Sequence, residues 1–164
     1  MENKPIKRNE HIVSLSKDHH VTLLFCWKIR TALKHEVAVD RMLSYVQYFW
    51  QQHMLPHFRE EETILFLPVK DDKVQRAVIE HEQIREKIEA LHIAGNDTKV
   101  QLAELANLVD AHVRYEEREL FPHLEQVLTN DQLEWIGKQL NEKHEMLRDD
   151  FGDEFWVRKK RDNE

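Results

Sequence analysis

Two ten-residue segments of the chain share a pattern that places a histidine and a glutamate on one face of a helix. Residues 57–66 and 112–121 both read H-x-R-x-E-E-x-x-L-F. The glutamate four positions after each histidine, Glu61 or Glu116, lies only about 40° around the helix from it. An imidazole beside a carboxylate can bind a metal ion, so the repeat predicts two equivalent pairs of metal ligands.

Two further histidines belong to the same arrangement. His19 and His81 each follow an acidic residue, and each lies on the apolar line that should face the core of its own predicted helix. Burying bare carboxylates in such a core costs several kcal/mol each unless they are paired or bind a metal. Four imidazoles and two carboxylates therefore predict a mixed nitrogen and oxygen site. Because a carboxylate can bridge two ions, a di-iron centre is the first choice.

The elements that carry these residues are helices, because the apolar residues recur with a period of about 3.6. The predicted helices run over about 15–34, 39–67, 72–93, 99–128 and 131–149. Pro68 should end the second helix, and Pro56 and Pro122 should make the second and fourth irregular. Gly95 is suited to follow the third helix, and Asn130 with Asp131 to cap the fifth.

This pattern predicts an all-α fold, an up-down-up-down four-helix bundle with a short fifth C-terminal helix. We expect one domain over 1–164, with the bundle core at about 12–128 and the appended helix and tail at about 131–164. The charged tail should fray at its end, while Phe155 and Trp156 indicate that its start docks on the bundle.

Composition excludes several other classes. The 164 residues include only 3 Gly and 4 Pro, too few for a sandwich or barrel with many tight turns. A net charge of −7 argues against nucleic acid as a partner. There is no apolar run of about 18 residues for a membrane span and no signal-peptide pattern. A single Cys fits a reducing compartment, so we expect a cytoplasmic protein.

These segments together resemble the hemerythrin-like, or HHE cation-binding, domain family. The resemblance rests on the residues at 18–20, 57–61, 80–82 and 112–117 and covers about 15–128. It implies a four-helix bundle with a non-haem centre of two iron ions that meets O2 or a related small molecule. The metal ligands that it implies are His19, His57, Glu61, His81, His112 and Glu116.

The chain departs from the oxygen-carrying members of that family. They place two histidines four apart on the third helix, whereas His81 is followed at that spacing by Arg85. The carboxylate on the fourth helix, Glu116, lies four residues after His112, as in bacterial and regulatory relatives. Both departures argue against a reversible O2 carrier.

Several other side chains are alternatives or neighbours of this site. His20 competes with His19, which is favoured because it follows an acid as His81 does. His53 could add a ligand, but a hydrogen-bonded core histidine is the more ordinary interpretation. His144 should pack on the apolar line of the fifth helix, and Cys26 should be a small buried residue. Trp27 is expected in the core, as are Phe49, Trp50, Phe66 and Phe121.

The leading functional hypothesis is a di-iron protein that binds or senses O2, NO, peroxide or iron itself. A second hypothesis is an oxidase or peroxidase enzyme with the same centre, motivated by Arg85 in place of an imidazole. A third is a protein-interaction module in which the metal only stabilises the fold. The expected partner in the first two cases is a small diatomic molecule or a peroxide, with neither nucleic acid nor a membrane involved.

Overall fold

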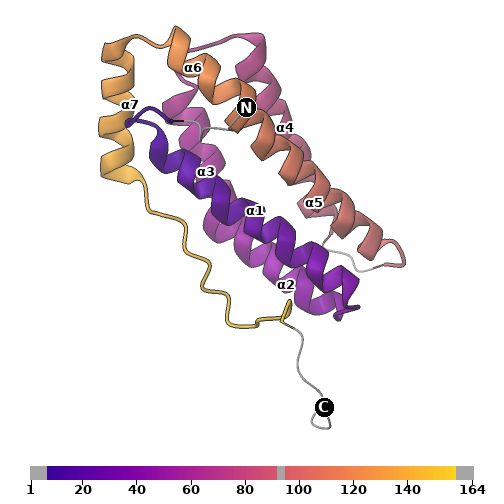
Figure 1. The fold of residues 1–164 in the computed structure, drawn as a ribbon. Coiled ribbons are helices and arrows are strands. Elements are labelled where there is room, and N and C mark those ends of the chain that lie inside the picture. The colour runs from indigo at the N-terminus through magenta and orange to yellow at the C-terminus, as the bar shows by residue number, and fades with distance from the viewer. Residues whose placement is uncertain (1–6, 92–94, 158–164) are drawn as a thin grey trace, which may run out of the picture.

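The computed structural model describes residues 7–91 and 95–157, and within these ranges the chain is helical without any strand. Four long helical stretches lie side by side, and a shorter helix follows them (Figure 1). Helix α1 contacts both α2 and α5, and α4 contacts α5. No helix in these ranges is long and apolar enough to cross a membrane.

The observed helices agree closely with the predicted ones. The first stretch is α1 (Val13–Lys34), and the third is α4 (Asp72–Ala90). The second joins α2 (Val39–Phe49), η1 (Trp50–Met54), α3 (Leu55–Glu60) and η2 (Glu61–Leu65). The fourth joins α5 (Thr98–Tyr115), η3 (Glu116–Leu120) and α6 (Phe121–Val127), and α7 (Asn130–Lys143) comes last. The predicted end of the third helix at 93 lies outside the described residues.

Three single π turns, the segments η1, η2 and η3, interrupt the second and fourth stretches. In a regular helix the ring of Pro56 or Pro122 would clash with the carbonyl group four residues earlier. The wider turns of η1 and η3 contain those carbonyls, so the helix continues through each proline. The irregularity predicted at both prolines is therefore a π turn. The turns η2 and η3 begin at Glu61 and Glu116, the equivalent glutamates of the repeat.

The core consists of two apolar clusters with a polar layer between them. One cluster includes Phe25, Phe58 and Ile84, and the other includes Leu15, Ile64 and Leu120. Each long stretch contributes to both clusters and carries its buried histidine at the level between them. The apolar packing on both sides therefore fixes the position of the polar residues along each helix.

The fifth helix differs from its prediction at both ends. Its N-cap is Thr129, one residue before the predicted pair, and Thr129 and Gln132 form a capping box. The helix ends at Lys143 instead of 149, because the chain turns into an extended backbone at His144. Residues 144–157, here called the C-terminal segment, then run back along the bundle toward α2 (Figure 1).

The C-terminal segment is fixed to the bundle by an aromatic anchor and ion pairs. Phe155 is fully buried beside Tyr45, as the docking prediction required. Asp149 accepts hydrogen bonds from Lys28 Nζ at 2.8 Å and from the Tyr45 hydroxyl at 2.5 Å. Arg41 pairs with Asp153 at 2.7 Å near the end of the segment.

We expect Phe155→Ala to lower the free energy of unfolding by about 3 kcal/mol, because it leaves a cavity where a buried ring was. Met146→Ala is the matched control, since Met146 belongs to the same segment but is largely exposed. Urea unfolding followed by circular dichroism measures both variants. Equal stability of the two would contradict the docking of the segment.

Candidate metal centre

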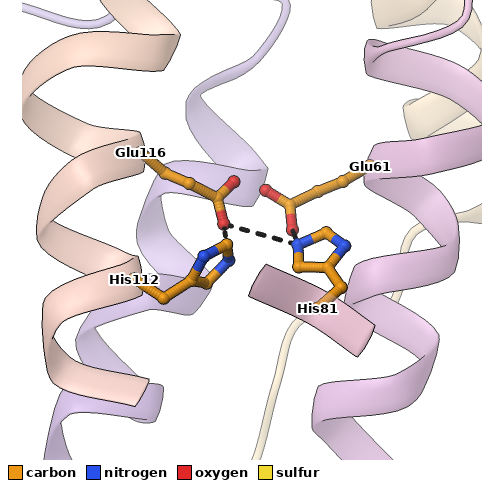
Figure 2. A group of neighbouring side chains, drawn as sticks. All are labelled: Glu61, His81, His112 and Glu116. Atoms are coloured by element: carbon orange, nitrogen blue, oxygen red, sulfur yellow. Dashed lines mark ion pairs between the residues drawn. The ribbon is translucent and has the colours of Figure 1, made fainter. Parts of the chain in front are cut away.

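The structure brings all six predicted ligands together in the polar layer. His19 comes from α1, His81 from α4, and the two histidine–glutamate pairs from α3–η2 and α5–η3. All six side chains are buried, and Glu61 and Glu116 are 0 % exposed. Figure 2 shows the two carboxylates pointing toward each other from different helices, with His81 and His112 beside them.

The Nε2 atom of every imidazole faces the carboxylates. His57 Nε2 lies 3.2 Å from Glu61 Oε1, and His81 Nε2 lies 3.3 Å from the same oxygen. His81 Nε2 is also 3.7 Å from Glu116 Oε1, to which His112 Nε2 is closer still. His19 Nε2 is 3.9 Å from Glu61 and 4.0 Å from Glu116. The two glutamates therefore lie between two pairs of imidazoles, His19 with His57 and His81 with His112.

The Nδ1 atom of each imidazole points outward to a second carboxylate. Because a carboxylate only accepts, each Nδ1 must carry a proton, which leaves Nε2 free to bind a metal. The four outward contacts are His57 with Asp18 at 2.9 Å, His112 with Glu80 at 2.8 Å, His19 with Glu117 at 2.6 Å and His81 with Glu62 at 3.1 Å.

These outward contacts repeat with the internal duplication. The acid before each first histidine, Asp18 or Glu80, binds the imidazole of the following helix in its own half. The acid after each inner glutamate, Glu62 or Glu117, binds an imidazole of the other half. The arrangement therefore has an approximate twofold symmetry, and it fixes the tautomer and orientation of all four rings, which strengthens metal ligands.

The inner atoms lack the hydrogen-bond partners that buried polar groups normally have. None of the four carboxylate oxygens of Glu61 and Glu116 accepts a hydrogen bond within the described ranges, and His81 Nε2 and His112 Nε2 have no partner either. His19 Nε2 and His57 Nε2 face each other at 3.3 Å. Lone pairs and carboxylate charges in such proximity repel one another unless positive charge lies between them. Metal cations would supply that charge.

The pKa shifts reflect the same demand for positive charge. Burial lowers the pKa of His57 and His81, but the adjacent carboxylates, Glu61 for His57 and Glu116 for His81, raise both well above 6.5. Burial lowers the pKa of His112 as well, but Glu116 and Glu80 raise it above 6.5. Conversely, His112 lowers the pKa of Glu116 well below 4.5 despite its burial. Without a metal, protons on the imidazoles balance the buried carboxylates.

The competing residues are placed clearly. His20 is exposed on α1, so His19 alone reaches the centre from that helix. His53 lies 3.2 Å from the Tyr48 hydroxyl, as expected of a core histidine. Arg85 is 52 % exposed and pairs with Glu89, so its side chain points away from the centre. Cys26 is buried in an apolar cluster, and burial raises the pKa of its thiol to about 12.

Two predictions about individual residues are wrong. Trp27 is 53 % exposed, although its aromatic character placed it in the core. His144 does not pack on an apolar line, because the helix has ended there. Its imidazole instead lies 2.5 Å from Glu60 and 3.3 Å from Asp18, and these two carboxylates raise its pKa to about 9.

The outward carboxylates are the functional residues that sequence reasoning identified least well. Glu62 and Glu117 occupy the same position in the two repeats, a pattern that inter-helix ion pairs inherited with the duplication would also produce. Their identical positions in the two repeats were the available signal. Which imidazole each would bind depends on the packing between helices, which the sequence pattern does not give.

Two cavities reach the outer side of the centre. One, of about 370 Å³, is lined by Asp18, His53, His57 and His144 among others. The other, of about 380 Å³, includes His81 in its wall. Small molecules could therefore approach candidate ligands from two sides of the bundle.

Comparison with known proteins supports this interpretation of the centre. The profile of the hemerythrin HHE cation binding domain matches residues 11–124, which contain all six inner residues and all four outward carboxylates. No curated protein and no solved structure matches the chain. Since the match covers well over half of the sequence, the chain belongs to the hemerythrin HHE cation-binding domain family.

Proposed function

We propose that the protein holds two non-haem iron ions and uses them to bind or sense O2 or a related small species such as NO or peroxide, or iron itself. The proposed ligands are His19, His57, Glu61, His81, His112 and Glu116, carried by an up-down-up-down four-helix bundle. The observation that carries the proposal is a set of four carboxylate oxygens that accept no hydrogen bond from any described residue and face four imidazole nitrogens in the core. The family match supports cation binding by these residues.

The donor set favours iron over a purely structural ion. Imidazole and carboxylate together suit iron, whereas a structural zinc site usually includes thiolates. Among the described residues the one cysteine, Cys26, is buried in an apolar cluster. Two ferrous ions would supply electrons and an open coordination position for a small oxidising ligand. A free thiol also suits the reducing cytoplasm, where we propose that the protein works.

The chain's own residues would position the metals and keep their surroundings dry. Glu61 and Glu116 lie between the two pairs of imidazoles, as two bridging carboxylates would. Phe58 stacks on the ring of His81 with centroids 3.8 Å apart, and Phe121 lies 5.2 Å from His19. These aromatic rings cover part of the centre with apolar surface, beside the two cavities that reach it from outside.

The direct test is anaerobic reconstitution with ferrous iron followed by exposure to O2, NO and peroxide in turn. We expect an absorption change that depends on the iron and on one of these species. Turnover of peroxide with a reductant, abolished in Glu61→Ala, would instead establish the oxidase or peroxidase alternative. Strong stabilisation by the metal without any redox change would favour the interaction module.

We expect Glu80→Gln to lower metal affinity by about 10-fold to 100-fold, because a neutral amide holds the Nδ1–H of His112 less strongly. Glu82→Gln is the matched control. Both residues flank His81, but Glu82 is exposed and lies beside Arg85. Competition with a ferrous chelator measures the two affinities. A loss of affinity in both variants, or in neither, would contradict the role assigned to Glu80.

A further inference from the structure

The two halves of the centre differ in what holds their outward carboxylates. Asp18 and Glu80 are equivalent in the repeat, and each accepts a hydrogen bond from the imidazole that follows it, His57 or His112. In each case the second carboxylate oxygen has a different partner. Asp18 Oδ1 lies 3.3 Å from His144 Nε2, whereas Glu80 Oε2 accepts from Arg76 Nε at 3.0 Å.

These two partners have different surroundings. Arg76 lies on the same helix as Glu80, and its side chain is 56 % exposed, so water can replace it. His144 comes from the end of α7, with a side chain only 8 % exposed, and the side chain of Asp18 is 1 % exposed. Asp18 Oδ1 is itself buried, and among the described residues it has no hydrogen-bond donor of good geometry. The imidazole of His144, which lies close to this oxygen, therefore balances the charge of Asp18.

His144 is held in place from two directions. Its Nδ1 lies 2.5 Å from Glu60, the residue before Glu61. It is also the first residue of the C-terminal segment, which Asp149 and Phe155 anchor to the bundle. With a carboxylate at each ring nitrogen, the imidazole is protonated at neutral pH and carries the charge that Asp18 needs.

We propose that His144 is a positioning residue for His57, acting through Asp18, and that it makes one half of the centre depend on the C-terminal segment. The contact chain runs from His144 to Asp18 and from Asp18 to His57. This inference rests on the metal centre proposed above. Removing the imidazole leaves Asp18 Oδ1 without positive charge, and Asp18 then turns toward the adjoining cavity and loosens His57.

The test is the rate at which a ferrous chelator removes iron from the anaerobically loaded full-length protein. In His144→Ala we expect one of the two irons to leave about 10-fold faster and the other at the wild-type rate. In His144→Gln the same iron should leave at an intermediate rate, because the amide N–H can donate to Asp18 but carries no positive charge. Arg76→Ala, the control at the equivalent position, should release both irons at the wild-type rates.

Faster release of a single iron separates positioning from a general loss of stability, which would speed the release of both. Glu60→Gln provides a second variant, since it frees His144 while leaving the C-terminal segment intact, and it should speed the same iron by a smaller factor. Wild-type rates for both irons in His144→Ala would overturn the proposal. Binding of only one iron by this variant would also overturn it, because His144 would then be a ligand. Failure of the wild-type protein to bind iron is a distinct result, which refutes the centre itself.

Discussion

Replacement of Glu116 by glutamine is expected to lower metal affinity by at least about 100-fold while the metal-free protein stays folded. The fully buried carboxylate lies against three imidazoles, those of His19, His81 and His112. Its loss removes a negative ligand that no neighbour replaces, so the effect should reach or exceed that of outer-shell changes. In the metal-free protein the amide keeps the volume of the carboxylate, and the neighbouring imidazoles can release the protons that balanced its charge, which offsets part of the lost ion pair.

The matched control is Glu119→Gln in the same π turn. Glu119 is exposed, and its carboxylate lies 3.8 Å from the exposed guanidinium of Arg76 instead of against an imidazole. Isothermal titration with ferrous iron under argon gives both affinities, and thermal unfolding of the metal-free proteins gives their stabilities. We expect the melting temperatures of the metal-free variants to lie within a few degrees of the wild-type value, which is the shift that a change of about 1 kcal/mol in stability produces. Wild-type affinity in Glu116→Gln would remove the carboxylate from the ligand set.

The stability of the metal-free protein should fall as the pH rises above 6.5, whereas that of the metal-loaded protein should change little. In the metal-free protein the raised pKa values of His57, His81 and His112 mean that the folded chain keeps protons that the unfolded chain releases. Their contribution to stability is complete below pH 6.5 and is lost as the pH rises through the raised values. Each of the three imidazoles can contribute up to about 1.4 kcal/mol per pH unit over that range.

Metal binding removes this slope. A metal displaces the inner protons, so its affinity rises with pH over the same range and offsets the falling stability of the metal-free chain, and the stability of the loaded protein should change little above pH 6.5. At the acid end Glu116, with its lowered pKa, makes the metal-free protein lose stability as the pH falls below about 4.5.

Urea unfolding between pH 5 and pH 9 with and without iron measures both slopes. His20→Gln is the control, because His20 is exposed beside the buried His19 and should leave the slopes unchanged. His57→Gln should reduce the slope of the metal-free protein. Parallel slopes with and without iron would show that protons and metal do not compete for the centre.

The helices and the six inner residues could be predicted because both depend on short-range periodicity. The four-residue spacing in each repeat puts His57 with Glu61, and His112 with Glu116, on one face whatever surrounds them. The duplication then predicted that these two histidine–glutamate pairs lie close together in the core. The apolar line of α1 predicted that His19 is buried and His20 is not, as the structure has them.

The parts that could not be predicted depend on contacts between distant segments. The partner of His144 is fixed by the end of α7, where the helix stops six residues before the predicted end at 149. Apolar residues still recur beyond Lys143, but Asp149 and Phe155 are bound by Tyr45 and its neighbours, and this tertiary packing favours an extended backbone. Likewise Trp27 follows the apolar pattern of α1 only loosely and faces solvent.

The most direct measurement is the metal content per chain after anaerobic iron reconstitution and desalting, determined by elemental analysis for the wild type and for Glu61→Gln with Glu116→Gln. The six buried ligands predict about two irons in the wild type and much less than one in the double variant. Zinc in place of iron, or no metal in a folded wild-type protein, would contradict a di-iron centre built from these residues.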